Sequence, residues 1–481
     1  MPRRSGLAPC LAAAALAPAV AAASPLEDTF LGGAVFTGPA NAHATALHYN
    51  PAALALDSGT HVFVSGDLRI DRLRVDRAPI DDAGVPGGTR DPGDARDTLA
   101  TPGGYAAFYS DVSGGRVTLG LAVYTPYAER YMPGRRAARY HTLGGHYYDI
   151  TVTPGIAFRI NSRIAVGFGV SVVAASLLDL EFARDTALEA GSAGLRADCG
   201  GAPCGAENPD ADQRYRIAAT PTLIGAGSSV TLGFHLGVAL TLRDRWHVGV
   251  GYASPTSSFG RLVVETDGRV DVDDAPRAGG GHVSGRARII YRLPQTIGVG
   301  VRGPAFGGLE WVANARWLNT GRHRRWDVRL FGGDLAGADV PDWYPRYRGL
   351  RDVFAVEAGL EQPAGRRVRL GARLRAETAG VDASRTAPNQ MYGANAGVAV
   401  GAEWRATDAL ALSAGYALVW FPDVTADPSA FDPAERVACA DAGYPIDECT
   451  ATREGRGIPT AAGTYRRLQN AMSIGIKIDW L

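Results

Sequence analysis

The feature that most constrains this chain is a strict alternation of apolar residues with small or polar ones. In the C-terminal segment MSIGIKIDWL, the apolar residues fall on one face: Met472, Ile474, Ile476, Ile478 and Trp480. The segment VTLGFHLGVALTL, residues 230–242, repeats the pattern along its whole length. A period of two predicts β-strands with one apolar face. Beyond the N-terminus, no continuous apolar run reaches the ~18 residues that a membrane helix needs.

The N-terminus predicts export. Residues 1–23 combine two arginines, an apolar stretch and an Ala-Ala-Ala cleavage site before Ser24. This arrangement is typical of a secretory signal peptide. A membrane anchor is the alternative reading, but the apolar stretch is short and contains two prolines. The exported chain is therefore expected to be soluble outside the cytoplasm or to span a membrane as a β-barrel.

Two features favour the barrel over a soluble sandwich. The face opposite the apolar one consists mainly of Gly, Ala, Ser and Thr, and not of the Lys and Glu expected in water. Aromatic residues also gather near strand ends, which is typical of the interfacial girdles of a barrel. They are Tyr124, Tyr127, Tyr252, Trp317, Trp404, Trp420, Phe421 and Trp480.

Fourteen segments fit the strand pattern, and the connections between them alternate in length. The segments are about 60–74, 102–111, 115–126, 146–160, 163–182, 228–242, 245–259, 285–302, 308–320, 350–362, 367–377, 392–405, 408–421 and 470–481. Long loops are expected at about 75–101, 127–145, 183–227, 260–284, 321–349, 378–391 and 422–469. Short periplasmic turns alternating with long outer loops are typical of outer-membrane barrels. We therefore predict an all-β fold, a 14-stranded antiparallel transmembrane β-barrel in the cell outer membrane of a Gram-negative bacterium.

Four cysteines fall in two predicted outer loops. Cys199 and Cys204 lie in one loop, and Cys439 and Cys449 lie in another. One local disulfide per loop is expected in an oxidising compartment. A zinc site is the alternative, although it would need thiolates kept reduced. The acidic stretch DVDD, residues 271–274, could hold Ca²⁺, but solvated loop charges are the favoured reading.

Charge and motifs give no support to nucleic-acid binding or to catalysis. Lys and Arg together number 49, as do Asp and Glu, so no basic excess points to nucleic acid. The stretch GVGVRG, residues 298–303, superficially fits a dinucleotide-binding pattern, but it lies within a strand with no helix after it. Lumen-facing glycines of a barrel explain it better. No catalytic residues, no cofactor and no metal are predicted.

The stretch HYNPAALAL reads as a helix start in an otherwise β chain. Asn50 is a good N-cap, and Pro51 suits the first helical position. A barrel of fourteen strands is too wide to be filled by its own side chains. We therefore expect residues 24–58 to form a hatch that plugs a barrel of residues 59–481. Asn50 either only caps the helix or also bonds the wall of the barrel near the third strand.

The N-terminal stretch GGAVFTGPANAHATALHYNPAALAL resembles the hatch of the FadL/TodX outer-membrane transporters. The Asn-Pro-Ala motif of that family is present as Asn50, Pro51 and Ala52. Residues 117–127, 245–255 and 291–302 are also similar to family positions. The resemblance implies passive uptake of long-chain fatty acids or similar hydrophobic molecules. It also implies that the hatch shifts on ligand binding and that the ligand leaves sideways through a kink in the third strand.

Thr125, Pro126 and Tyr127 are the candidates for that lateral gap. Proline donates no ladder hydrogen bond, so a strand interrupted at Pro126 leaves nearby backbone unpaired. The alternative is that Pro126 merely ends the strand at the outer rim. Continuous pairing of the second and third strands there would exclude a gap.

Three lumen residues are candidates for ligand contact: His235, Arg316 and Arg373. Arginine could hold a carboxylate in bidentate geometry. The favoured alternative is that the lumen charges pair with one another and seat the hatch.

The expected partners are a long-chain fatty acid or other hydrophobic ligand, outer-membrane lipid and lipopolysaccharide, and the barrel-assembly machinery. A plugged barrel of this size can work as a monomer. Two other functions compete: uptake of aromatic hydrocarbons, and a structural or adhesive surface barrel. The predicted hatch favours transport, because an adhesin does not need a plug.

Overall fold

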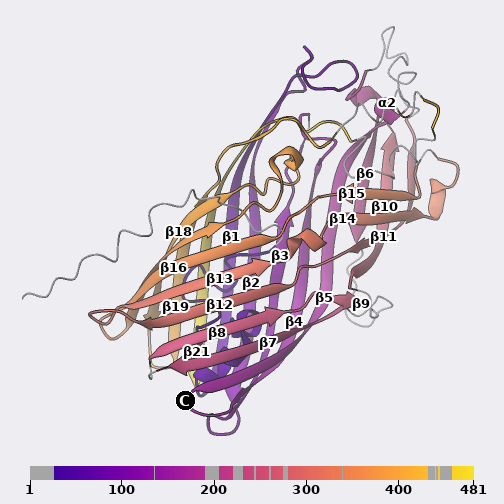
Figure 1. Ribbon diagram of the computed structural model, residues 1–481. Helices are drawn as coiled ribbons and strands as arrows, with labels where there is room; N and C mark the ends of the chain where they lie inside the picture. Colours follow the sequence, from indigo (N-terminus) through magenta and orange to yellow (C-terminus); the bar gives the residue numbers. More distant parts are fainter. Residues whose placement is uncertain are drawn as a thin grey trace, which may run out of the picture.

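A closed antiparallel barrel forms the body of the molecule (Figure 1). The computed structural model describes residues 27–134, 136–189, 205–219, 231–242, 245–258, 262–274, 280–338, 340–431, 439, 442–444 and 458–480. The predicted signal peptide, Cys199, Cys204 and Cys449 lie outside these residues. Within the described residues, no helix combines the length and apolar character needed to cross a membrane.

Fourteen strands form the wall, as the alternation predicted. They are β1 (Thr60–Arg77), β2 (Asp94–Asp111), β3 (Val117–Arg130), β4 (Gly144–Arg159), β5 (Ile164–Asp185), β7 (Thr231–Leu242), β8 (Trp246–Ala253), β12 (Thr296–Pro304), β13 (Glu310–Leu318), β16 (Val353–Ala364), β17 (Val368–Glu377), β18 (Asn395–Arg405), β19 (Leu410–Trp420) and β21 (Gly463–Trp480). The first and last strands pair along their whole length, from Thr60 opposite Trp480 to Arg77 opposite Gly463. This pairing joins the last strand to the first and closes the barrel.

The two faces of the wall differ as predicted. On β7, Phe234, Leu236 and Val238 are each about two-fifths exposed on the outside, while His235 is buried inside. Trp404, Trp420 and Trp480 are half exposed on the outer surface, which fits the expected aromatic girdles. Three of the predicted girdle residues do not face outward. Tyr124 and Phe421 are only 2% and 4% exposed, and Tyr127 packs against the buried core beside the hatch.

The short connections all lie at one end of the barrel, near Trp480. They are 112–116, 160–163, 305–309, 365–367 and 406–409. In an outer-membrane barrel this is the periplasmic end. The opposite end carries the long connections and the helix α2 (Thr186–Glu189) (Figure 1).

Four of the predicted long loops contain separate strands, which is a correction to the sequence prediction. Above the membrane wall, the outer half of β5 pairs with β6 (Asp212–Ala219), and further strands follow in the order β10 (Val264–Asp274), β11 (His282–Tyr291), β14 (Arg325–Phe331) and β15 (Trp343–Tyr347). We call these strands, with the outer half of β5, the outer sheet. The predicted strand 285–302 is two strands, β11 and β12, separated by a break that contains Pro294. Two short strands, β9 (Ser257–Ser258) and β20 (Val424–Ala426), pair with β7 and β21.

Aromatic rings pack the outer sheet and continue the buried cluster that contains Phe30 and Phe36 of the hatch. The rings of Phe182, Tyr215 and Tyr344, from β5, β6 and β15, stack with centroids 5.1–5.4 Å apart. Trp326 packs edge-on against Tyr147 on β4. The first and last strands of the outer sheet are therefore brought into contact, so that the sheet curls over the barrel mouth. The DVDD stretch is part of β10 and not a loop, with alternate residues on its two faces.

The hatch, of which the structure describes residues 27–58, lies inside the barrel. It contains α1 (Ala46–Tyr49) and the 3-10 helix η1 (Pro51–Leu56). Among the described residues, four further one-turn 3-10 helices lie outside it: η2 (Pro209–Ala211), η4 (Thr320–Arg322), η5 (Gly333–Leu335) and η6 (Ala383–Arg385). Leu31, Leu47 and Leu54 of the hatch are fully buried against aromatic residues of the wall. The hatch therefore plugs the lumen.

Candidate functional site

Asn50 both caps a helix and bonds the wall. Its Oδ1 accepts from the backbone N–H of Ala52 at 3.2 Å, which is the predicted cap. Its Nδ2 donates to the carbonyls of Pro39, at 2.7 Å, and Val238, at 3.1 Å. Asn50 therefore bonds the wall, which was one of the two predicted alternatives. The bond was expected near the third strand, but Val238 is on β7. Pro51 and Ala52 are buried at the first positions of η1.

Glycines of the wall let the hatch approach the backbone closely. A Cβ on Gly237 would lie 2.0 Å from Oδ1 of Asn50, and one on Gly251 would lie 1.8 Å from the carbonyl oxygen of Tyr49. Both distances are far below van der Waals contact. The small residues on the inner face therefore form a seat for the hatch. The GVGVRG stretch contributes to this seat, since Gly300 faces Ala40 of the hatch.

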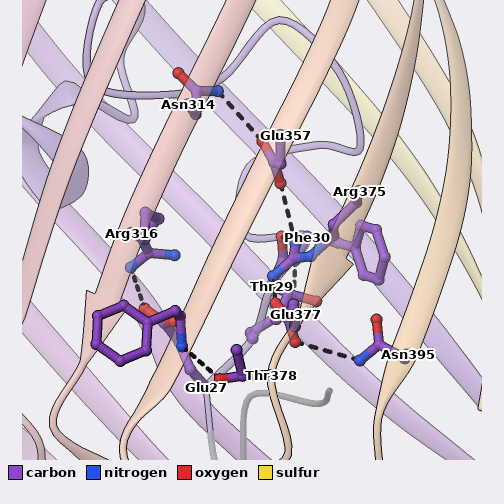
Figure 2. A network of polar contacts seen from close by, with 12 residues as sticks. Glu27, Thr29, Phe30, Asn314, Arg316, Glu357, Arg375, Glu377, Thr378 and Asn395 are labelled. Atoms are coloured by element: carbon purple, nitrogen blue, oxygen red, sulfur yellow. Dashed lines mark hydrogen bonds and ion pairs between the residues drawn. The ribbon is translucent and has the colours of Figure 1, made fainter. Parts of the chain in front are cut away.

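A network of ion pairs holds the N-terminal part of the hatch (Figure 2). Arg316 on β13 donates to Glu27 at 2.5 Å. Arg375 on β17 donates to the carbonyl of Thr29 at 3.2 Å and to Glu357 at 3.2 Å. Two strands of the wall thus bind the hatch through arginine side chains. Arg316 pairs with a carboxylate of the hatch itself, and Arg375 pairs with the wall residue Glu357 while it binds the hatch backbone.

The lumen arginines predicted for ligand contact are paired. Arg316 binds Glu27, and Arg373 lies 3.3 Å from Glu361 and 3.5 Å from Glu357. Burial alone would raise the pKa of Glu27, but Arg316 and His48 outweigh burial and lower that pKa to about 2. The geometry matches the alternative in which lumen charges pair with one another and seat the hatch.

His235 belongs to a hydrogen-bonded chain under the hatch. Its Nε2 lies 2.6 Å from Oγ of Ser171, and its Nδ1 lies 3.2 Å from the carbonyl of His48. The ring of His48 is 6.2 Å from that of His235, and its Nε2 lies 3.5 Å from Glu27. His235, Arg316 and Arg373 therefore all lie against the hatch. His48 lies between His235 and Glu27, the partner of Arg316.

The seam between β2 and β3 is interrupted at the predicted place. Ladder pairing between these strands ends at Tyr105 opposite Tyr124, although both strands continue outward. The pairing of β3 with β4 also shifts register between Tyr124 and Tyr127. Thr125, Pro126 and Tyr127 are thus located where the backbone ladder fails, and Pro126 does not end the strand.

Other bonds replace the missing ladder. The backbone N–H of Gly104 donates to Oγ1 of Thr125 at 3.1 Å, and Arg130 donates to the carbonyl of Ala100 at 3.0 Å. From the lumen, the N–H of Asp28 donates to the carbonyl of Pro126 at 2.8 Å. The hatch therefore covers the interruption from the inside.

The sequence analysis missed the charged residues beside this seam. Arg69 on β1 donates to the carbonyl of Ala128 at 2.8 Å, and its Nε lies 3.8 Å from Asp28. Asp67, two residues before Arg69, is buried on the same face. The sequence pattern of β1 could have identified them. Leu68 and Ile70 form its apolar outer face, so the charged residues that alternate with them must point into the lumen.

Little space remains where the N-terminal part of the hatch meets the lumen arginines. A void lined by Phe30, Tyr49, Arg316 and Arg373, among others, has a volume of about 30 Å³. This volume suits about one water molecule and is far below the few hundred Å³ of a typical ligand pocket. A hydrophobic ligand could enter this region only if the hatch moved.

Only one of the four cysteines expected to form disulfides, Cys439, lies within the described residues. Cys439 is disulfide-bonded, and the predicted pairings with the cysteines outside the described residues stay predictions. In the part of the chain that the structure describes, no group of three or more His, Cys, Asp and Glu side chains is placed to hold a metal ion.

Comparisons with known proteins agree with this geometry. The fold is similar to the crystal structure of a Pseudomonas aeruginosa FadL homologue, with a TM-score of 0.71 and 14% identity over 96% of this chain and 100% of that one. It is also similar to the P. putida toluene transporter TodX, with a TM-score of 0.61 and 12% identity over 95% and 99% of the two chains. No curated protein sequence matches the chain.

A family model decides the assignment. The model described as outer membrane protein transport protein (OMPP1/FadL/TodX) matches residues 9–318, which is more than half of the chain. The chain belongs to the OMPP1/FadL/TodX family. This FadL/TodX protein is therefore an outer-membrane channel for hydrophobic molecules, and its family consists of transport channels, not enzymes.

Proposed function

We propose that this channel takes up long-chain fatty acids or similar hydrophobic molecules passively, with movement of the hatch and sideways exit between β2 and β3. The observation that carries the proposal is the interrupted seam beside Pro126, where backbone pairing between these strands stops. A hydrophobic solute that leaves through such a gap enters the membrane directly and avoids the periplasmic water.

The hatch is the gate in this proposal. The backbone N–H of Asp28 in the hatch donates to the carbonyl of Pro126, and Glu27 forms an isolated β-bridge with Tyr127. Withdrawal of these residues would free the seam and enlarge the small void behind it. We propose that residues 24–58 act as one gating unit on a barrel of residues 59–481.

A crosslink across the seam tests lateral exit. Cysteines introduced by A100C and R130C, joined by a short thiol crosslinker, would tie β2 to β3 where only a side chain now joins them. We expect uptake of labelled oleate by cells to fall to the level of a deletion strain. The uncrosslinked double variant is expected to keep most of its uptake.

The matched control shares one cysteine. Ile70 on β1 lies directly opposite Ala100 in continuous pairing, so I70C with A100C ties strands that are already joined. This crosslink is expected to leave uptake unchanged. Full uptake with the 100–130 crosslink in place would contradict lateral exit.

One observation favours a second candidate, the uptake of aromatic hydrocarbons. Arg316 and Arg373 are both bound by carboxylates, so a ligand carboxylate would have to displace an existing partner. An uncharged ligand has no such requirement. Two similar structures are named as toluene transporters, TodX and the Ralstonia pickettii TbuX. If R316A and R373A both leave oleate binding unchanged while toluene uptake is high, the hydrocarbon function is the better one.

A further inference from the structure

A hollow rich in arginine opens on the outside of the barrel, above its lipid-facing surface. Its volume is about 630 Å³. Five arginines and two aspartates line it: Arg292, Arg322, Arg324, Arg351, Arg385, Asp352 and Asp382. The lining therefore carries an excess of positive charge. Neither the family's transport function nor the hatch explains this hollow.

The position of the hollow relative to the membrane follows from the strand faces. Phe354 on β16 is 56% exposed on the lipid-facing side, and Asp352 lies two residues earlier on the same face. The indole N–H of Trp317 donates to Asp352 at 3.1 Å. Amphipathic aromatic side chains such as tryptophan mark the boundary between hydrocarbon and head groups. The hollow lies directly outward of this boundary.

A polar chain follows the same boundary across neighbouring strands. The hydroxyl of Tyr252 donates to Gln295 at 3.1 Å, and Gln295 donates to Asn319 at 3.3 Å. Asn319 then donates to both oxygens of Asp352, at 2.8 and 3.0 Å. These bonds fix Asp352 at the floor of the hollow. The two aspartates of the lining offset two of its five arginines, so an excess of three positive charges remains.

The backbones that carry the arginines are fixed in place. The carbonyl of Arg292 accepts from His323 at 2.9 Å, and the carbonyl of Arg324 accepts from the N–H of Arg348 at 2.7 Å. The N–H of Arg351 donates to Gly380 at 2.8 Å. The side chain of Arg351 is paired with Asp382, whereas the side chains of Arg292 and Arg324 are exposed. Rotation of the Arg292 and Arg324 side chains is thus enough to bring two guanidinium groups to an anion.

We propose that this hollow binds the phosphate groups of an outer-leaflet glycolipid, the lipid A part of lipopolysaccharide. Arginine binds phosphate through two parallel hydrogen bonds, and several arginines together suit a phosphorylated head group. The acyl chains of the same lipid would lie on the apolar surface that begins at Phe354. A lipid head group fits this position better than a soluble anion, because the hollow adjoins the hydrocarbon boundary.

Binding of purified lipid A to the purified, folded barrel in detergent tests the proposal by native mass spectrometry. The variant R292Q/R324Q removes two exposed arginines for which the described contacts involve only the backbone. We expect it to bind lipid A at least about tenfold more weakly, because charge-assisted hydrogen bonds are lost. The control R366Q/R367Q removes two exposed arginines from the periplasmic turn after β16 and is expected to bind as the unaltered protein does.

Two further measurements on the unaltered protein separate the sources of phosphate. Lipid A treated with phosphatase is expected to lose most of its binding, and inorganic phosphate is expected to bind much more weakly than lipid A. Equal binding of R292Q/R324Q, of the control variant and of dephosphorylated lipid would overturn the proposal. Inorganic phosphate that binds as tightly as lipid A would show a site for a soluble anion and would overturn the lipid assignment. If R292Q/R324Q does not fold, the phosphatase comparison still decides.

Discussion

At the scale of single residues, Asn50 explains why the family motif begins with an amide. One side chain caps η1, joins two parts of the hatch and reaches the wall at Val238. Serine can replace the cap but cannot span the other two contacts, because its side chain is shorter. The motif is therefore a device for seating the hatch and not only a helix start.

Asn50→Ser is expected to loosen the hatch without unfolding the barrel. The buried carbonyl of Pro39 would lose the Asn50 amide, at a cost of about 1–3 kcal/mol. We expect faster entry of small hydrophilic solutes in a liposome-swelling assay and an unchanged mobility of the folded barrel on gels. If solute entry stays at the level of the unaltered protein, the wall contact of Asn50 has no role in closure.

Gly237→Ala tests the seat from the side of the wall. The new Cβ would lie 2.0 Å from Asn50, so the hatch must move away. Gly233→Ala is the matched control on the same face of β7, because its Cβ would make only ordinary contacts at 3.5 Å or more. We expect the first variant to leak in the swelling assay and the second to stay closed. Equal behaviour of the two variants would contradict the glycine seat.

At the scale of elements, the hatch is bound to the wall by a pair that acid should break. The pKa of Glu27 is lowered from 4.5 to about 2, so its ionised form favours the seated hatch above pH 4.5. This stabilisation is lost as the pH falls from 4.5 towards 2. We expect solute entry to stay constant from pH 8 to pH 5 and to rise only below that range.

Glu27→Gln is expected to raise solute entry at neutral pH and to weaken its increase in acid. Glu310→Gln is the control. Glu310 pairs with Arg302, a residue of the wall and not of the hatch, so this variant is expected to keep the hatch closed. A rise in solute entry of the same size at pH 7 for both variants would show that lumen charge in general, and not the Glu27–Arg316 pair, holds the hatch.

The sequence predicted the elements of the wall well and those above it poorly. Each strand in the membrane must place apolar residues outside and small residues inside, so its alternation is unambiguous, as in β7 and β21. Above the membrane both faces of a strand can carry charge, and β10 was therefore interpreted as an acidic loop. The inward direction of Arg316 was predictable from alternation, but its partner Glu27 was not, because that pairing depends on the path of the hatch.

At the scale of the whole molecule, the barrel and the outer sheet are joined along β5 and share a continuous core. Phe182 and Trp326 of the outer sheet belong to one large buried cluster. Phe30 of the hatch and Val419 of the wall belong to the same cluster. Because β5 runs through both, the outer sheet stands directly on the wall (Figure 1). The closure of the wall nevertheless depends on its own backbone ladder between β1 and β21, in which the outer sheet takes no part. This division predicts that damage to the aromatic packing of the outer sheet leaves the barrel intact.

Trp326→Ala tests this division. Trp326 is 3% exposed and contacts Tyr147, Tyr291 and His323, so its removal leaves a large cavity and costs about 3–5 kcal/mol. We expect proteases added to whole cells to cut the outer sheet more rapidly, while the barrel keeps its resistance to detergent unfolding. Trp404→Ala is the control, because Trp404 is half exposed on the lipid-facing surface and belongs to the wall. If Trp326→Ala instead abolishes the folded barrel, the outer sheet and the wall are one cooperative unit, and the gate inside could not be studied apart from the cover above it.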